Sequence, residues 1–201
     1  MISAQKKHGR PVSFDRNKTI QTALDLYWRQ GVLATSLNQV ARMTGVSKPT
    51  LYRYFENEDG LLYDVLECYL SGNVDKFECL EAHENIRHGL TEWFEQIITA
   101  WTATDASPHG CLFCDCLHEI DRLGVKSQSL IKTYLSQQPE KLASILSIAR
   151  DKGQLKDGVD VHQAALYLSS HVIAMNSMVK MGISTEQLLS ISDLVIGSIV
   201  R

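Results

Sequence analysis

One stretch near the N-terminus decides the fold: residues 35–55, with the sequence TSLNQVARMTGVSKPTLYRYF. Its first part, residues 36–39, has the pattern of a capping box, in which a serine hydroxyl and a glutamine amide satisfy the backbone donors at the start of a helix. Gly45 follows, where a positive φ costs little, and Ser47 can cap another helix that has Pro49 in its first turn. Two short helices joined by so tight a turn must cross steeply, so the stretch predicts a helix-turn-helix.

Another helix is expected before this stretch, because apolar residues recur at the spacing of one helix face until Gly31 ends the pattern. These residues are Ile20, Ala23, Leu24, Tyr27 and Trp28. Between the two crossing helices we expect Ala41, Val46 and Leu51 to form a small shared core. The N-terminal part therefore predicts a three-helix head.

The charge of the chain is divided unevenly. The net charge is -3, but residues 1–60 carry nine Lys/Arg against five acids, a balance of +4, which leaves -7 for the remainder. A basic head on an acidic body is expected where one end of a protein meets phosphate, although small imbalances also arise by chance. Residues 1–14 carry Lys6, Lys7 and Arg10 without an apolar period, so we interpret them as a basic arm along DNA or as a solvated tail.

The rest of the chain predicts helices, because apolar residues keep a helical period and no period-two pattern of useful length is found. The expected helices cover about residues 57–70, 90–101, 111–122, 127–152, 160–181 and 185–200. We therefore predict an all-α fold of about nine helices. Residues 1–56 would form the DNA-binding head with its helix-turn-helix, and residues 57–201 a helical-bundle domain for signal sensing and dimerisation.

The last expected helix is apolar around most of its circumference. Its apolar residues are Leu188, Leu189, Ile191, Leu194, Val195, Ile196, Ile199 and Val200. Such a helix needs cover on both sides, either from its own domain or from a second subunit. We expect a homodimer formed through the last two helices.

Composition favours a globular protein and argues against disorder: 44% of the 201 residues are hydrophobic and 21% are charged. No signal-peptide pattern opens the chain, and the longest uncharged stretch, residues 163–179, holds several polar residues, so no membrane association is expected. Five cysteines, an odd count without a secretion signal, are expected in a reducing cytosol as thiols, metal ligands or redox sensors before structural disulfides, so we expect a cytoplasmic protein. No phosphate loop, Ser/His/Asp order or His-Glu-x-x-His motif occurs, so we predict neither an enzyme nor a cofactor.

The sequence of residues 35–55 resembles the signature of TetR-family transcriptional regulators, with a Thr-Ser start, Val-Ala, Gly-Val-Ser and then Leu-Tyr-x-Tyr-Phe. With the preceding helix it spans about a quarter of the chain, and the body resembles the family in helix count and order. From Gly110-Cys111-Leu112 the body also looks like a branch of the family that includes electrophile-responsive repressors. The resemblance implies a homodimer that binds double-stranded operator DNA and responds to a small-molecule effector.

The resemblance also implies which side chains meet DNA. Those expected in the major groove are Lys48, Thr50, Tyr52 and Arg53, together with Asn38 or Gln39. Those expected on phosphates are Thr35, Ser47 and Tyr54. This division agrees with chemistry, because lysine suits guanine, Asn or Gln suits adenine, and hydroxyls suit phosphate oxygens. Packing is the alternative role for Tyr52 and the expected role for Phe55.

One residue departs from the family pattern. Many members have a lysine three residues after the phenylalanine, at the start of the linking helix, and this chain has Glu58 there. The change removes a phosphate contact and adds repulsion. We expect the helix start to be set back from the DNA backbone, or the basic arm to compensate.

A Cys/His cluster in residues 109–118 suggests a sensor. A helix beginning near Gly110 would place Cys111, Cys114 and His118 on one face, and the first turn would favour a Cys111 thiolate. Three hypotheses stay open: a reactive Cys111 resolved by Cys114, a metal site that includes His109 or His118, and small apolar fillers of a helical core. The spacing Cys-x-x-Cys-x-Cys, which includes Cys116, matches no usual zinc pattern, so no metal is predicted.

The body helices also carry aromatic and sulfur-bearing residues that could line an effector pocket. We predict that Trp93, Trp101, Tyr167, His171 and Met175 surround an apolar or aromatic effector, while core packing is the alternative for all of them. His171 in particular could be a core histidine with a satisfied partner. The sequence as a whole predicts a ligand- or thiol-responsive repressor that binds a near-palindromic operator as a dimer.

Overall fold

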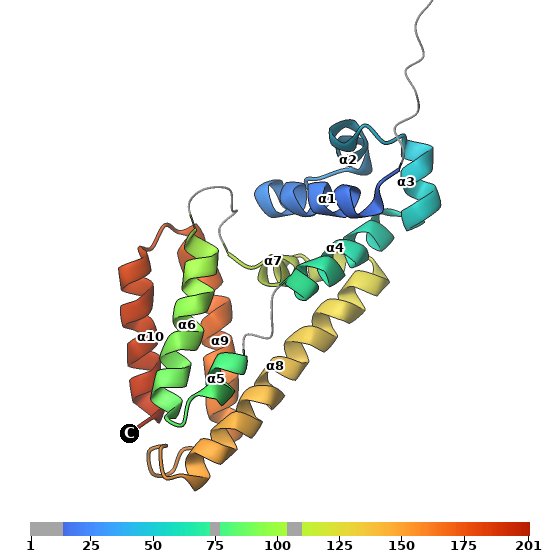
Figure 1. The fold of residues 1–201 in the computed structure, drawn as a ribbon. Helices are drawn as coiled ribbons and strands as arrows, with labels where there is room; N and C mark the ends of the chain where they lie inside the picture. The colour runs from blue at the N-terminus through green and yellow to red at the C-terminus, as the bar shows by residue number, and fades with distance from the viewer. Residues whose placement is uncertain (1–13, 73–76, 104–109) are drawn as a thin grey trace, which may run out of the picture.

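The computed structural model describes residues 14–72, 77–103 and 110–201, and in these residues the chain is helical (Figure 1). The first helices are α1 (Arg16–Gln30), α2 (Leu37–Thr44), α3 (Lys48–Phe55), α4 (Glu58–Gly72) and α5 (Glu78–Ala82). The later ones are α6 (Ile86–Thr102), α7 (Leu112–His118), η1 (Ile120–Arg122), α8 (Val125–Asp151), α9 (Val161–Lys180) and α10 (Thr185–Ile199). The described part contains ten α-helices rather than nine, because the short α5 gives no periodic signal of its own. The predicted all-α fold is confirmed.

The turn between α2 and α3 has the predicted caps. Ser36 Oγ accepts a hydrogen bond from the Gln39 backbone N–H at 3.3 Å, and Ser47 Oγ accepts one from the Thr50 N–H at 3.3 Å. Between them Gly45 ends α2 with φ at +70°. The expected reciprocal half of the first capping box is absent, because the Gln39 amide donates to the Gln30 side chain instead. The helix-turn-helix thus forms from local signals (Figure 1).

The core of the head continues past α3. Buried residues of α1 to α4 form one hydrophobic cluster with residues from α7, the following loop and the start of α8. These later members are Leu112, Phe113, Cys116, Leu123 and Ile131. The predicted boundary at residues 56 and 57 falls between α3 and α4, but packing is continuous across it. The head therefore packs against α4, α7 and the first half of α8.

A carboxylate on α4 connects this helix to the start of α8. Asp59, in the first turn of α4, accepts hydrogen bonds from the backbone N–H groups of Lys126 and Ser127 at 3.0 and 3.1 Å. The Ser127 hydroxyl donates to the same side chain at 2.5 Å. Asp59 thereby caps the start of α8, where free N–H groups favour a negative charge. The start of α4 and the start of α8 are held together.

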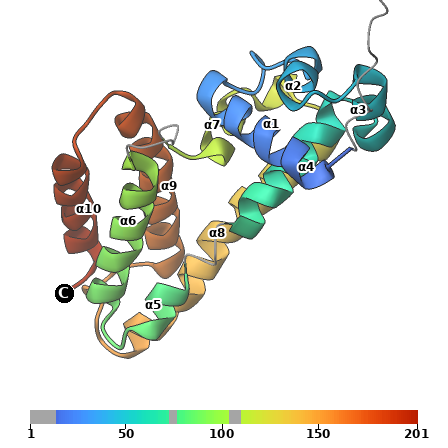
Figure 2. The same cartoon turned by 45° about the horizontal axis from the view of Figure 1, so that its top comes forward.

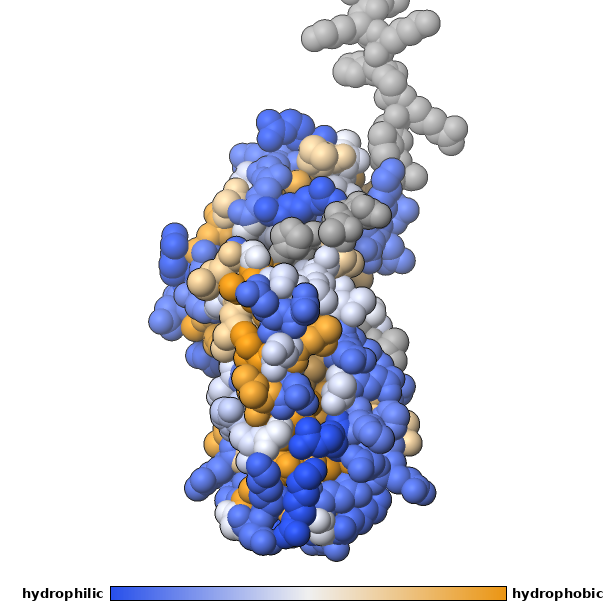
Figure 3. All heavy atoms as spheres, turned by 90° about the vertical axis from the view of Figure 1, so that its left-hand side faces the viewer, coloured by the Kyte–Doolittle hydropathy of each residue, from blue (hydrophilic) through white to orange (hydrophobic). Residues whose placement is uncertain are grey.

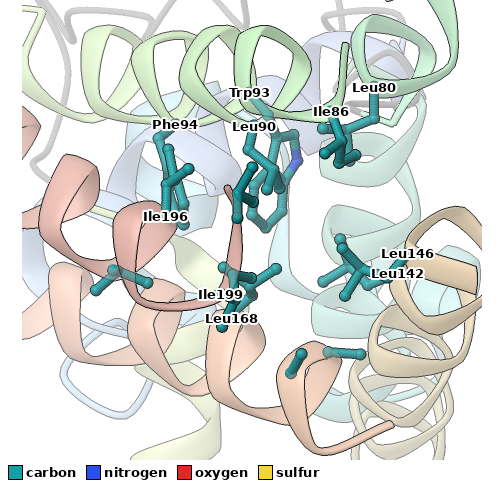
Figure 4. Packing of buried hydrophobic residues seen from close by; sticks show 14 of the residues in the cluster. Leu80, Ile86, Leu90, Trp93, Phe94, Leu142, Leu146, Leu168, Ile196 and Ile199 are labelled. Carbon is teal, nitrogen blue, oxygen red and sulfur yellow. The ribbon is translucent and has the colours of Figure 1, made fainter. Parts of the chain in front are cut away.

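A second cluster forms the core of the body, where α6 packs against α10 and α9, and α9 packs against α8 (Figure 2). Leu90, Trp93 and Phe94 project from α6 toward Leu168 of α9 and Ile196 of α10 (Figure 4). Burial of such large side chains contributes about 1.5–3 kcal/mol each to folding. The body is thus a helical bundle with its own core.

The outer faces of α9 and α10 keep apolar residues in contact with solvent. Leu166 on α9 is 57% exposed and Leu194 on α10 is 72% exposed. Hydrophobic residues lie among hydrophilic ones on the α10 side of the body (Figure 3). The inner side of α10 is covered by its own domain, so only its outer side lacks cover. None of the described helices has both the length and the hydropathy that a membrane span requires.

Candidate DNA-binding helix and body cavity

Helix α3 is amphipathic, and its polar side faces away from the molecule. Leu51 and Phe55 are 0% and 2% exposed and anchor the helix in the core of the head. On the opposite side Lys48, Tyr52 and Arg53 are exposed, and we call these three residues the recognition edge. The Lys48 ammonium lies 5.9 Å from the centre of the Tyr52 ring, within the range of a cation–π contact. The edge presents two cations and a phenol at the end of the head.

The hydroxyl residues around the edge differ in their exposure and in their hydrogen-bond partners. Ser47 and Thr50 pair their hydroxyls at 2.8 Å beside the start of α3. Thr35 is only 7% exposed, and its hydroxyl donates to the carbonyl of Gly31 at 2.9 Å. The predicted phosphate contact through the Thr35 hydroxyl is therefore replaced by an internal bond that closes the turn after α1.

Two residues of α2 were expected beside the groove. The structure exposes Asn38, while Gln39 is half-buried and bonded to Gln30. Of the two alternatives, Asn38 is the one whose amide is open to solvent.

Tyr54 belongs to an aromatic stack that the sequence did not reveal. Its ring lies 3.8 Å from that of Phe14, and the Arg53 guanidinium lies 5.0 Å from the centre of the Tyr54 ring. The residue is nevertheless 46% exposed. Phe14 thus fixes the chain entering α1 against the end of α3. Phe14 is the last residue of the expected basic arm, residues 1–14, and the other residues of that arm lie outside the described residues.

The unusual Glu58 lies in the first turn of α4 and is exposed. A carboxylate there interacts favourably with the helix dipole, which gives this residue a stabilising role in place of a phosphate contact. Its charge also adds to the effect of burial in raising the pKa of Tyr27.

The body contains a cavity of about 130 Å³ between α6, α8 and α9, with the start of α7 at one end. Its walls carry Phe77, Trp93, Ile97, Trp101, Cys111, Cys114, Tyr134, Leu135, Gln138, Leu142, Ser169, Val172 and Ile173. A larger hollow of about 490 Å³ beside α5 is open to solvent and is not lined by the predicted residues. The smaller cavity is partly open to solvent, and its lining is mainly apolar, as is common for small-molecule sites.

Only part of the predicted effector pocket lines this cavity. Trp93 and Trp101 do so, at 4% and 2% exposure. Tyr167 instead points to solvent on the outer face of α9, with 45% exposure. His171 and Met175 are buried against α10, where the His171 Nε2 lies 3.3 Å from the Ser192 hydroxyl. His171 is thus a core histidine with a partner, and burial lowers its pKa.

The cysteine cluster is divided between two environments. Cys111 is the N-cap residue of α7, one position before the first turn in which it was expected, and it is half-buried in the cavity wall beside Cys114. The Tyr69 hydroxyl donates to Cys111 Sγ at 3.6 Å. A hydrogen bond with Cys111 and burial both raise the pKa of Cys114. Cys116 points into the core of the head, where burial raises its pKa to about 12.

The histidines of the cluster do not complete a metal site in the described residues. His118 Nδ1 is 2.7 Å from the carbonyl of Cys114, and His109 lies outside the described residues. Within the described residues no group of three or more His, Cys, Asp or Glu side chains is arranged to hold a metal ion.

The peptide group between Gly110 and Cys111 joins the head to the body. Its carbonyl accepts a hydrogen bond from Trp28 Nε1 of α1 at 3.2 Å, and its N–H donates to Asn176 Oδ1 of α9 at 2.6 Å. Gly110 has φ at +101°, and a Cβ there would lie 2.2 Å from Asn176 Oδ1, so glycine is required.

The same asparagine extends the connection into α7. Asn176 is 1% exposed, and its amide donates to Asp115 at 3.0 Å, while Lys180 pairs with the same carboxylate. A buried amide whose oxygen and nitrogen both have partners fixes the register of the elements that it joins. The start of α7 is thus held by α9 on one side and by α1 on the other.

Comparisons with known proteins match both halves of the chain. Residues 20–65 match the sequence model of bacterial regulatory proteins of the tetR family, and residues 84–190 match that of the tetracyclin repressor-like C-terminal domain. A relative, the HTH-type transcriptional repressor ComR of Escherichia coli (strain K12), is 29% identical over 192 residues, which cover 94% of this chain and 90% of ComR.

Solved structures share the fold. A cysteine mutant of the TetR family transcriptional regulator CifR, complexed with a 26-base-pair operator DNA, has a TM-score of 0.81 at 21% identity and covers 95% of this chain and 100% of its own. The reduced form of NemR from E. coli has a TM-score of 0.79 at 20% identity, with 92% and 96% covered. At these identities the likeness establishes the fold alone.

Proposed function

Because the chain belongs to the tetR family of bacterial regulatory proteins, it is a transcriptional regulator of the TetR type and not an enzyme, and we propose that it is a cytoplasmic dimeric repressor released from its operator by a small apolar ligand or by modification of Cys111. The observation that carries the proposal is the Gly110–Cys111 peptide group, which is hydrogen-bonded to both α1 and α9 and belongs to a residue whose thiol lines the cavity.

DNA binding is assigned to the recognition edge. Lys48 is an exposed cation in the first turn of α3, the part of such a helix that reaches base edges in the major groove, and Arg53 is an exposed cation in its last turn. We propose that Lys48, Thr50, Tyr52 and Arg53 meet bases with Asn38, and that Ser47 and Tyr54 meet phosphates. CifR, which shares the fold, was solved on operator DNA, and ComR is named as a repressor.

Dimerisation is assigned to α9 and α10. The exposed Leu166 and Leu194 lie on the outer faces of these helices, and a second copy would cover them. A two-fold dimer presents two recognition edges, which fit half-sites about one turn of DNA or a multiple of it apart. The operator should therefore be near-palindromic.

Release is assigned to the cavity. A ligand between α6, α8 and α9, or an adduct on Cys111, would displace the Gly110–Cys111 peptide from Trp28 or Asn176. Because Trp28 belongs to α1, the head would rotate relative to the head of the second subunit. The rotation changes the spacing of the two recognition edges, which lowers the affinity for the operator without unfolding the protein.

The thiol route has two chemical forms. An electrophile adds to the Cys111 sulfur, which forms an S–C bond as the thiol proton is lost. An oxidant such as diamide takes two electrons and two protons from Cys111 and Cys114, which leaves a disulfide and the reduced hydrazine form of diamide. The Tyr69 hydroxyl donates a hydrogen bond to Cys111 Sγ, so a reaction at this sulfur would also disturb a contact with α4.

The experiment that tests the repressor is selection and sequencing of the DNA that the purified protein binds, followed by release from that DNA. Diamide should release wild-type protein, and Cys111→Ser should respond weakly. Cys68→Ser is the matched control, since Cys68 is also half-buried but lies on α4 outside the cavity wall, and it should respond as wild type.

Unchanged release of Cys111→Ser would remove the thiol route and leave the ligand route. The metal hypothesis has a separate test: mass spectrometry of the purified dimer should detect no zinc or copper above background.

A further inference from the structure

Three buried polar atoms in the cavity wall lack hydrogen-bond partners. They are Trp93 Nε1, Trp101 Nε1 and the Ser169 hydroxyl, and within the described part of the chain they are the buried side-chain nitrogen and oxygen atoms left unpaired. All three residues line the same cavity. The unpaired groups are therefore gathered at one place.

Buried polar groups in folded proteins nearly always have partners, because an unmade hydrogen bond away from water is costly. The remaining tryptophan follows this rule, since Trp28 Nε1 donates to the carbonyl of Gly110 at 3.2 Å. Trp93 and Trp101 depart from it at 4% and 2% exposure. Their indole N–H groups have the unmet hydrogen-bonding capacity expected of a site built for another molecule.

The unpaired groups belong to two facing walls. Trp93 and Trp101 are eight positions apart on α6, with Ile97 midway, so they lie on one face of that helix. Ser169 belongs to α9, on the facing wall with Val172. A ligand held between the helices could accept hydrogen bonds from both sides.

The chemistry of the wall limits the ligand. An indole N–H only donates, so its partner must carry an acceptor. No charged side chain is among the residues that line the cavity, and a charged ligand would be buried there without a counter-charge. A cavity of about 130 Å³ is close to the roughly 150 Å³ that holds a benzene ring.

We propose that the cavity binds a neutral compound the size of a single ring whose carbonyl oxygen accepts from Trp93 Nε1 or Trp101 Nε1, with Ser169 as a further partner. The inference deepens the proposed function, because it names the class of ligand for the site assigned to release. Binding is non-covalent and requires no reaction at Cys111.

The test uses the DNA-free protein and three probes of nearly the same shape in calorimetry. Acetophenone carries the carbonyl, α-methylstyrene replaces its oxygen by a methylene group, and benzoate carries a charge. Acetophenone should bind about tenfold more tightly than α-methylstyrene, since one hydrogen bond is lost, and benzoate should bind more weakly than acetophenone. Equal affinity for the first two, tighter binding of benzoate, or no binding of acetophenone at millimolar concentration would overturn the proposal.

Neighbouring serines supply a matched pair of variants. Ser169→Ala should weaken acetophenone binding several-fold and leave α-methylstyrene unchanged, whereas Ser170→Ala, on the exposed side of α9, should change neither. Trp101→Phe should reduce the difference in affinity between acetophenone and α-methylstyrene. An equal loss of affinity for both probes would indicate that the substitution changed the shape of the cavity, and would contradict a hydrogen bond to the carbonyl oxygen.

Thermal unfolding without ligand tests the unpaired hydroxyl even if a variant folds poorly. Removing an unpaired buried hydroxyl should not lower the thermal midpoint of Ser169→Ala relative to wild type, and a clear fall would mean that the hydroxyl has a partner. Failure of these binding tests leaves DNA binding intact, whereas failure of the proposed function would appear as absent operator binding with the ligand preference retained.

Discussion

The recognition edge and the cavity wall satisfy their polar groups in opposite ways. On α3 the exposed side chains are open to solvent, and the caps that shape the helix come from Ser47 and Thr50, a few residues apart. In the cavity the unpaired groups come from α6 and α9, far apart in the sequence, and no nearby residue completes them. This difference agrees with the proposals that the edge meets a partner outside the fold and that the cavity holds a ligand.

The largest expected effect concerns the edge. Lys48→Ala combined with Tyr52→Ala should weaken operator binding by roughly 1000-fold, because each side chain of a specific contact contributes about 1–3 kcal/mol. The free energy of unfolding should change by less than about 0.5 kcal/mol, since both residues are exposed. Fluorescence anisotropy with labelled operator and urea unfolding measure the two quantities.

The buried side of the same helix supplies the control. Leu51→Ala should lower the free energy of unfolding by about 2–5 kcal/mol, as expected for a fully buried leucine. If the edge variant instead lost comparable stability, its side chains would be part of the core and the comparison would fail.

A smaller effect is expected at the contact between cavity and head. Gly110→Ala should lower the free energy of unfolding by about 1–3 kcal/mol, because the left-handed backbone is strained and the new Cβ would collide with Asn176. It should also reduce release by ligand or diamide, since the Gly110–Cys111 peptide would lose its position between α1 and α9. Thermal unfolding and operator release are measured together.

Gly153→Ala separates the effect of backbone strain from the effect of a collision between the new Cβ and a neighbouring side chain. Gly153 also has a positive φ, at +71°, but a Cβ there would meet nothing within 4 Å. It should lose less stability than Gly110→Ala and respond to ligand as wild type. An altered response in this variant would show that general destabilisation, and not the peptide contact, governs release.

The smallest effect concerns pH. Burial lowers the pKa of His171 below its ordinary value near 6.5, so the unfolded chain takes up this proton first as the pH falls. Stability should therefore decrease as the pH drops through about 6.5, and His171→Gln should reduce that decrease. His162→Gln, on the exposed face of α9, is the control, and an identical pH dependence in both variants would contradict the assignment.

The fold of the head could be predicted because its signals are local. Ser36, Gly45 and Ser47 act on backbone groups within three residues of themselves, and the structure confirms the helices that they delimit. Helix α5 could not be predicted, because Glu78–Ala82 is too short to show a period and is stabilised by packing on α6. Local chemistry does not determine such an element.

The lining of the cavity was less predictable than the helices that form it. Helix α9 has apolar residues on several faces, so periodicity alone could not decide that Ser169 lines the cavity while Tyr167 is exposed and His171 faces α10. The partners of Gly110 are also distant, since Trp28 and Asn176 come from α1 and α9. The DNA contacts of the edge stay predictions, because they depend on a molecule outside the chain.

In the proposed dimer two copies of the recognition edge bind DNA together, and hydroxyl-radical footprinting of the selected operator measures this. We expect two protected segments related by a two-fold axis, with centres about one turn of DNA or a multiple of it apart. A single protected segment without two-fold symmetry, or protection that survives Lys48→Ala with Tyr52→Ala, would contradict it.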